Sequence, residues 1–315
     1  MKARAPAKAY GAAAPGAVTA LSELIGNTPL LRLGRLCPRG NLFAKAEWYN
    51  PGQSVKDRAV WAIMREAIAS GELTPDKTIL DATSGNTGIA YAMLGAALGY
   101  RVTLCMPAGV TPERQKILRA YGAELVLTDP ALFSDGAILK ARELDAASPG
   151  RYFYGDQYSN EANWRAHYET TGPEIWAQTQ GRITHWVSCL GTSGTFIGTA
   201  RYLRARSPDV ALIEVQPDSP FHGLEGMKHM PSSIVPAIYD DRLATGKMTV
   251  RTEDAYRWVI RAARGEGLLL GISSGAALAA ALQVAEAHPD ATVVTLFPDN
   301  GTKYLSDRFW EEQPA

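Results

Sequence analysis

Residues 50–58 of this chain read Asn-Pro-Gly-Gln-Ser-Val-Lys-Asp-Arg, a Pro-Gly turn that leads into a helix. An apolar pattern with helical spacing follows, from about residue 55 to residue 68. Ser54 and Asp57 have the spacing of a capping box, with Asp in place of the usual Glu or Gln. The sequence therefore predicts a helix that has Lys56 in its first turn.

Lys56 would occupy an unfavourable place for a cation. A helix N-terminus carries roughly +0.5 of an elementary charge, and Arg58 lies two residues further on. Both disfavour the ammonium form, and burial in a cleft would add to the effect. A lysine with a lowered pKa is the amine that forms Schiff bases with carbonyl compounds. Lys56 is thus a candidate nucleophile, and the alternative is a surface lysine whose stem covers apolar neighbours.

Length and composition exclude several classes of protein. A chain of 315 residues can bury a substantial core and is expected to form two lobes or domains. The formal net charge is zero with 20% charged residues, which argues against nucleic acid as a partner. No apolar run reaches the 18 or so residues of a membrane span. The basic segment 1–8 lacks the apolar core of a secretory signal and is expected to be a flexible tail, with organelle targeting as the alternative.

The three cysteines predict a reducing, cytoplasmic compartment. Cys37, Cys105 and Cys189 are odd in number and scattered, without a Cys-x-x-Cys pair. Cys105 and Cys189 lie in apolar runs that look like strands, so we expect buried thiols rather than disulfides. No histidine spacing suggests metal ligands, and no metal site is expected.

Strand and helix patterns alternate along most of the chain. Such alternation predicts an α/β fold with parallel sheets and helices on both faces. Residues 218–250 have little periodicity and are expected to form a long excursion near the functional site. The expected strands are 41–47, 78–83, 101–106, 124–128, 152–154, 184–190, 211–216 and 292–297, and the expected helices include 55–68, 86–98, 112–121, 135–147 and 160–178.

Three polar segments each join a strand or turn to a helix. Residues 83–88, Thr-Ser-Gly-Asn-Thr-Gly, concentrate hydroxyls, an amide and backbone N–H groups, as a cradle for a carboxylate or phosphate would. Residues 271–276, Gly-Ile-Ser-Ser-Gly-Ala, contain one serine that N-capping explains and a second without a structural duty. An ordinary N-cap is the alternative for residues 83–88.

Residues 191–195, Gly-Thr-Ser-Gly-Thr, have two glycines that allow close backbone approach and three hydroxyls for an anion. The segment is neither a Walker loop nor a G-x-G-x-x-G fingerprint. Glu214 ends the next strand, at about the sequence separation from this turn at which an acidic residue binds a ribose in dinucleotide-binding proteins. A dinucleotide therefore stays an alternative. A short cradle without a lysine suits a terminal phosphate monoester better, and a tight turn between strand and helix is the second alternative.

A lysine at a helix start, a phosphate cradle and a carboxylate cradle together indicate a Schiff-base cofactor with a phosphate and an amino-acid substrate. Here the chain resembles the cysteine synthase and cystathionine β-synthase family, which are pyridoxal-phosphate enzymes of fold type II. The resemblance runs from about Leu21 to Ser306. It rests on five motifs in order: Ile-Gly-Asn-Thr-Pro-Leu, Asn-Pro-x-x-Ser-Val-Lys-Asp-Arg, Thr-Ser-Gly-Asn-Thr-Gly, Gly-Thr-x-Gly-Thr and Gly-Ile-Ser-Ser-Gly-Ala.

The resemblance implies a role for each matching residue. Lys56 would form the Schiff base with pyridoxal 5'-phosphate, Asn86 would bond the ring hydroxyl, and Ser273 would face the ring nitrogen. The phosphate would be held by Gly191, Thr192, Ser193, Gly194 and Thr195, and the substrate carboxylate by Thr83, Ser84, Thr87 and Gln157.

The resemblance also implies an activity and an architecture. We expect β-replacement on an O-activated serine, with O-acetylserine favoured and sulfide as the second substrate, to give L-cysteine. Residues 1–48 and 160–315 would form a larger cofactor-binding domain, and residues 49–159 a smaller domain that closes on the substrate. A homodimer is expected. The absence of an evident haem segment and of an appended regulatory domain favours the cysteine synthase branch.

Alternatives within and beyond the family stay open. Homocysteine as the acceptor, a serine/threonine dehydratase, a racemase and a non-catalytic regulator are the rivals in reaction class. Residues 225–230, Glu-Gly-Met-Lys-His-Met, are more basic than in plain acetylserine enzymes. Phosphoserine enzymes of this branch carry a basic residue here, so Lys228 implies a contact with an anionic donor, and a solvated loop lysine is the alternative. Residues 298–301, Pro-Asp-Asn-Gly, depart from the family's Pro-Ser-Ser-Gly.

Overall fold

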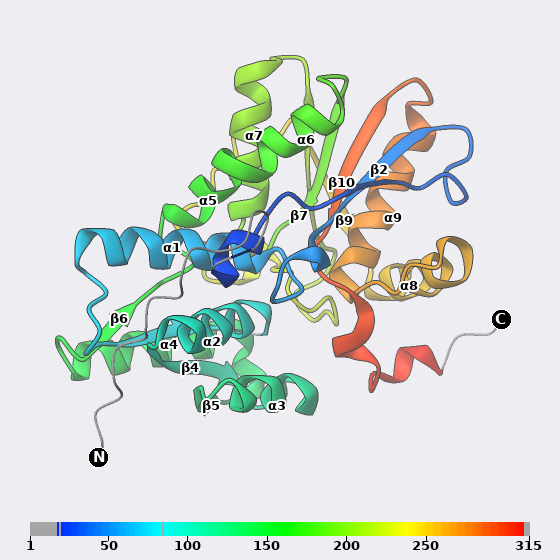
Figure 1. The fold of residues 1–315 in the computed structure, drawn as a ribbon. Coiled ribbons are helices and arrows are strands. Elements are labelled where there is room, and N and C mark those ends of the chain that lie inside the picture. Colours follow the sequence, from blue (N-terminus) through cyan, green and yellow to red (C-terminus); the bar gives the residue numbers. More distant parts are fainter. Residues whose placement is uncertain (1–17, 19, 84, 312–315) are drawn as a thin grey trace.

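The computed structural model describes residues 18, 20–83 and 85–311, and these form two sheets with helices on both faces (Figure 1). The larger sheet has the strand order β1-β2-β10-β7-β8-β9 and the smaller one β5-β4-β3-β6. The α/β architecture predicted from the alternation is therefore confirmed. The expected N-terminal tail, and Ser84 among the expected site residues, lie outside the described part.

All strands of the larger sheet are parallel except β1, which runs antiparallel to β2. Successive residues of its strands serve opposite cores: Val293 packs in the cluster with α8 and α9, and Val294 in the cluster with α6 and α7. The strands are β1 (Leu30–Arg32), β2 (Asn41–Ala46), β7 (His185–Cys189), β8 (Ala211–Pro217), β9 (Gly246–Val250) and β10 (Thr292–Phe297), and the helices are α6 (Gly172–Gln178), α7 (Gly194–Arg206), α8 (Thr252–Glu266) and α9 (Ile272–Ala287).

The smaller sheet is parallel throughout. Ile79 packs with α1 and α2 on one face, and Leu80 packs with α4 on the other. Its elements are β3 (Thr78–Ala82), β4 (Arg101–Pro107), β5 (Glu124–Thr128), β6 (Tyr152–Tyr154), α1 (Lys56–Ser70), α2 (Asn86–Leu98), α3 (Pro112–Ala120) and α4 (Phe133–Ala147).

Two sequence predictions about elements were wrong in part. The excursion 218–250 ends in β9, an edge strand that pairs with β8. Its Gly-Lys-Met-Thr-Val sequence is only half-buried, so the period-two pattern is weak. The helix expected at 160–178 is α5 (Ala162–Ala166), a π-helical turn at His167–Thr171, and α6. Pro173 has no N–H for a bond four residues back, and the π turn accommodates this loss.

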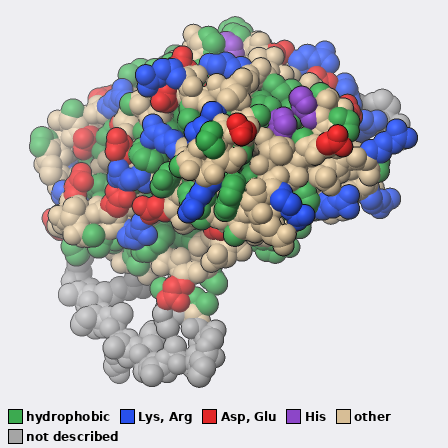
Figure 2. All heavy atoms as spheres, turned by 90° about the horizontal axis from the view of Figure 1, so that it is seen from above, with side chains coloured by type: hydrophobic (Ala, Val, Ile, Leu, Met, Phe, Trp, Pro, Cys, Tyr) green, Lys and Arg blue, Asp and Glu red, His purple; other side chains and the backbone are tan. Residues whose placement is uncertain are grey.

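The remaining general predictions concern thiols, metals and membranes. Among the described residues the three cysteines are free; Cys37 and Cys105 are buried, whereas Cys189 is only partly so. No cluster of three or more metal-ligand side chains occurs in this part of the chain. No described helix has the length and apolar character to cross a membrane. Figure 2 shows acidic and basic side chains interspersed over much of one face, as the zero net charge leads one to expect.

Candidate active site

One cleft gathers most of the segments singled out in the sequence. It lies where α1, α2, α7 and α9 begin, next to the carboxyl ends of parallel strands, which is where such folds bind ligands. From the predicted set the lining contains Lys56, Asn86, Thr87, Gln157, Gly191, Thr192, Ser193, Thr195, Lys228 and Ser273.

Lys56 is the first residue of α1, as predicted. Its backbone N–H donates to Ser54 Oγ at 3.3 Å. The predicted capping box is wrong, because the Asp57 carboxylate accepts the N–H of Gly52 at 2.5 Å instead. The Pro-Gly turn folds back onto Asp57, so the carboxylate stabilises the turn before the helix rather than the helix cap.

Burial lowers the pKa of the Lys56 amine to about 8, and the nearby Asp299 carboxylate opposes this shift. Across the part of the chain that is described, no hydrogen bond or ion pair engages this amine. Arg58 was also expected to disfavour the ammonium form, but its guanidinium is ion-paired with Glu47 and Glu174, which compensates its charge. Burial is therefore the main cause of the lowered pKa.

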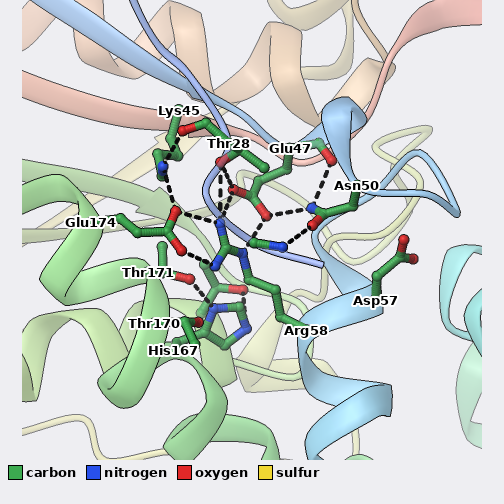
Figure 3. Close-up of polar contacts among 12 residues, drawn as sticks. Thr28, Lys45, Glu47, Asn50, Asp57, Arg58, His167, Thr170, Thr171 and Glu174 are labelled. Atoms are coloured by element: carbon green, nitrogen blue, oxygen red, sulfur yellow. Dashed lines mark hydrogen bonds and ion pairs between the residues drawn. The ribbon is translucent and has the colours of Figure 1, made fainter. Parts of the chain in front are cut away.

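A buried ionic network anchors the first turn of α1 from behind (Figure 3). Arg58 Nε donates to Glu47 Oε2 at 2.7 Å, and its Nη1 donates to Glu174 Oε1 at 2.6 Å. Lys45 Nζ pairs with the other oxygen of Glu174 at 2.6 Å. Because these residues come from β2, α1, α6 and the turn after β2, the network fixes the position from which Lys56 enters the cleft.

Two side chains organise the segment 83–87: Thr83, whose hydroxyl accepts backbone N–H groups, and Thr87, which pairs with Gln157. Thr83 Oγ1 accepts the N–H groups of Gly85 and Gly88, both at 3.0 Å, and lies behind the cleft lining. Thr87 Oγ1 donates to Gln157 Oε1 at 2.7 Å, and Gln157 Nε2 donates to the carbonyl of Ala82 at 2.5 Å. Thr87 and Gln157, 70 residues apart, thus lie side by side in the cleft, and their role in binding a carboxylate stays a prediction.

The segment 191–195 has the properties of an anion cradle. The hydroxyl of Ser193 is buried and has no hydrogen-bond partner among the described residues. Ser193 has φ +69° and immediately precedes Gly194, the first residue of α7. A Cβ at Gly191 would collide with the carbonyl of Gly226, so only glycine fits there. A free buried hydroxyl at the N-terminus of a 13-residue helix suits a phosphate.

The two serines of the 271–276 segment differ in their contacts. Ser274 Oγ is fully buried and donates to the carbonyl of Asp299 at 3.0 Å. Ser273 lines the cleft. Neither caps α9, whose N-cap is Gly271 without a side-chain bond, so the capping duty assigned to one of them was wrong. The division between a structural serine and one that faces the ligand nevertheless agrees with these contacts.

Lys228 is not a solvated loop lysine. Its side chain is 4% exposed, its Nζ donates to Asp135 Oδ1 at 2.6 Å, and the ammonium lies 5.5 Å from the centre of the Tyr158 ring. Glu214, which kept a dinucleotide alternative open, is fully buried and accepts the Tyr239 hydroxyl at 2.9 Å. Its carboxylate is thereby engaged away from the cleft.

Sequence reasoning missed several residues in or beside the cleft. Arg114 from α3 is buried against Gly85, pairs with Glu225, and lies 4.6 Å from the centre of the Tyr304 ring. The charged residues of the lining are Lys56, Arg114, Lys228 and Glu225, so cations outnumber carboxylates. Such a lining favours anionic ligands. No local motif marks Arg114 or Tyr304, because each reaches the cleft from a segment that was not singled out.

A family model described as "Pyridoxal-phosphate dependent enzyme" matches residues 21–299. The chain belongs to this family. A cysteine synthase from Aquifex aeolicus is 48% identical over 92% of each chain, and cysteine synthase B from Escherichia coli is 42% identical over 94% of this chain and 97% of its own. A crystal structure of cysteine synthase from Entamoeba histolytica has a TM-score of 0.88 at 33% identity, over 100% of this chain and 95% of that one.

The family's cofactor, pyridoxal 5'-phosphate, fits the side chains that the cleft presents. Its aldehyde needs an amine, and Lys56 has a lowered pKa and no counter-ion bonded to it in the described structure. Its phosphate needs donors, and Ser193 has a free hydroxyl beside the glycines of the 191–195 segment. These are the residues that would hold the cofactor.

Proposed function

We propose that this protein makes L-cysteine from O-acetyl-L-serine and sulfide by pyridoxal-phosphate-dependent β-replacement. The single observation that carries the proposal is the Lys56 amine, which has a lowered pKa and shares one cleft with an anion cradle and the Thr87–Gln157 pair. The names of the relatives, which are cysteine synthases, support the choice of reaction.

Bound at Lys56, pyridoxal phosphate supplies the electron sink that makes the α-proton of an amino acid acidic. The Lys56 amine would take the α-proton at Nζ as the β-substituent departs. A pKa of about 8 suits this task, because a useful fraction of the amine is neutral near neutral pH. The same amine would return the proton to the α-carbon when sulfide has taken the place of the leaving group.

The other side chains bind and orient. Residues 191–195 would hold the phosphate, Asn86 the ring hydroxyl and Ser273 the ring nitrogen. A neutral serine hydroxyl cannot stabilise a full pyridinium charge, which suits elimination of a leaving group over accumulation of a carbanion. The substrate carboxylate would bind at Thr87 and Gln157, and the resemblance assigns Thr83 and Ser84 to the same carboxylate.

Closure of the cleft is part of the proposal. Residues 49–159 contain the smaller sheet with α1 to α4, and residues 1–48 and 160–315 contain the larger sheet. We expect the smaller unit to move toward the larger one when the substrate carboxylate engages Thr87 and Gln157. Closure would exclude water from the reacting carbon. A homodimer in the cytoplasm is the expected state of the enzyme.

O-phosphoserine is a second candidate donor, and the burial of Lys228 is the observation that favours it. A dianionic leaving group needs a fixed cation, and a charge-assisted hydrogen bond to phosphate contributes on the order of 1.5–3 kcal/mol. Asp135 now accepts from this ammonium at 2.6 Å, so phosphoserine would have to compete with the Asp135 carboxylate. O-acetylserine, with its neutral ester, needs no such exchange.

The proposal is tested with purified protein and its Lys56→Ala variant. We expect a yellow wild-type protein that turns over O-acetylserine with sulfide to cysteine, and a variant without the covalent adduct and without turnover. Supplying phosphoserine and homocysteine in parallel identifies the donor and the acceptor. A protein that stays colourless after incubation with pyridoxal phosphate contradicts the proposal.

A further inference from the structure

The side-chain amide of Asn86 is held at both ends by charged residues. Lys303 Nζ donates to Asn86 Oδ1 at 2.9 Å, and Asn86 Nδ2 donates to Asp299 Oδ2 at 2.7 Å. The Tyr304 hydroxyl donates to the same oxygen of Asp299 at 2.8 Å. The two partners of Asn86 and Tyr304 are buried, and all three follow β10, more than 200 residues along the chain. Lys303 and Tyr304 also lie beyond residues 21–299, which the family model matches.

These charges determine which way the amide points. A rotation by 180° would place the amide N–H₂ against the Lys303 ammonium and the amide oxygen against the Asp299 carboxylate. Both contacts would then be repulsive, because two donors and two acceptors would face each other. The Asn86 nitrogen has two hydrogens, and Asp299 accepts one. The second N–H is left for a ligand in the cleft that Asn86 lines.

Lys303 also contacts the turn that precedes Lys56. Its Nζ lies 3.4 Å from the carbonyl oxygen of Gly52 and 3.3 Å from that of Gln53. The side chain is 4% exposed, and burial lowers its pKa while the Asp299 and Asp57 carboxylates oppose that shift. One buried ammonium therefore joins the turn before α1 to the first residue of α2.

Asp299 is engaged from several sides as well. Its backbone carbonyl accepts the Ser274 hydroxyl at 3.0 Å, and the residue pairs with Ser54 in an isolated β-bridge. A Cβ at Gly271 would collide with its carboxylate. The carboxylate thus has little freedom to leave Asn86.

We propose that Lys303 and Asp299 are positioning residues, which fix the Asn86 amide so that one N–H is directed at the ring hydroxyl of pyridoxal phosphate. Lys303 additionally keeps Asn86 at a set distance from the Lys56 turn. The inference rests on the proposed role of Asn86 in holding the cofactor.

The test compares Lys303→Met with Lys303→Gln in the full-length enzyme. Met removes the donor, so we expect the visible absorption maximum of the bound cofactor to shift and the Kd for pyridoxal phosphate to rise roughly tenfold. Gln retains an N–H donor and should stay near wild type in both. Lys77→Met is the control, because Lys77 donates to the carbonyl of Glu72 at 2.7 Å in an exposed turn before β3 and does not line the cleft. It should leave the spectrum and the Kd unchanged.

Asn86→Ala separates the two proposals. If Asn86→Ala changes the spectrum and the Kd but Lys303→Met changes neither, the positioning role is overturned while the cofactor site stands. If Asn86→Ala changes neither, the role of Asn86 fails and this inference fails with it. Should Lys303→Met not fold, Asp299→Asn tests the other end of the amide, with the same spectral shift expected and an unchanged spectrum contradicting the proposal.

Discussion

Glu174 allows a quantitative test of the network behind Lys56. It holds Arg58 and Lys45 through its two oxygens, and its side chain is 13% exposed. Burial acts to raise its pKa, but the hydrogen bonds and charges of Arg58 and Lys45 bring it to about 2, from an ordinary 4.5. We expect Glu174→Gln to destabilise the protein strongly, because Gln keeps the shape but leaves two buried cations short of one negative charge.

The size of the effect follows from the pKa. A pKa of about 2 in place of the ordinary 4.5 corresponds to roughly 3 kcal/mol of unfolding free energy at neutral pH. The folded pKa lies below the unfolded one, so this stabilisation is present above about pH 4.5 and is lost as the pH falls toward 2. At pH 3 the same relation leaves roughly half of it or less.

Urea unfolding at pH 7 and at pH 3, at equal cofactor content, measures the difference between wild type and variant. Glu169→Gln is the matched control, since Glu169 pairs with Arg65 on the surface with both side chains half exposed. Such a pair contributes less than about 1 kcal/mol. If Glu174→Gln costs no more than this control at pH 7, or costs as much at pH 3 as at pH 7, the network does not anchor α1 in the way argued.

Three further expectations concern the cleft. The rate at which cofactor-free protein binds pyridoxal phosphate should rise with pH and level off above about 8, because only the neutral Lys56 amine reacts; stopped-flow absorbance checks this, and a pH-independent rate contradicts it. Ser193→Ala should weaken pyridoxal-phosphate binding roughly ten- to a hundredfold, whereas Thr199→Ala, which removes another buried unpaired hydroxyl of the same region, should not; equilibrium titration distinguishes the two. Lys228→Ala should lower kcat/KM for phosphoserine and leave that for acetylserine unchanged; an unaltered ratio of the two donors removes Lys228 from donor choice.

Much of the fold follows from patterns that are local in the sequence. The strand at 292–297 and the helix at 86–98 were predicted with the bounds that the structure has. Both have a dense apolar pattern and clear ends, with a turn or a polar loop on each side. Lys56 was placed correctly in a first helical turn for the same reason, since the Pro-Gly turn and the apolar period both lie within twenty residues of it.

The parts that were missed depend on partners far along the chain. Nothing near Lys303 in the sequence indicates that its ammonium meets Asn86, 217 residues away. Arg114 resembles any other arginine of an amphipathic helix until α3 is packed against Gly85. The capping box failed because Asp57 found a closer donor in the folded turn. A local sequence pattern shows which polar and charged side chains a segment contains. Which of these side chains contact one another depends on the tertiary fold.

The contacts of Asp299 affect the reactivity of the Lys56 amine. Its carboxylate raises the pKa of Lys56, and a direct ion pair between the two would keep the amine protonated and unreactive. One carboxylate oxygen accepts from Asn86 and Tyr304, and the other has no hydrogen-bond partner among the described residues, Lys56 included. The other cations of the lining, Arg114 and Lys228, each have a carboxylate of their own. Among the charged residues of the described lining, Lys56 therefore lacks a bonded carboxylate, and burial can lower the pKa of its amine. An acidic residue beside this cleft is compatible with a lysine of lowered pKa because no ion pair joins the two in the described part of the chain.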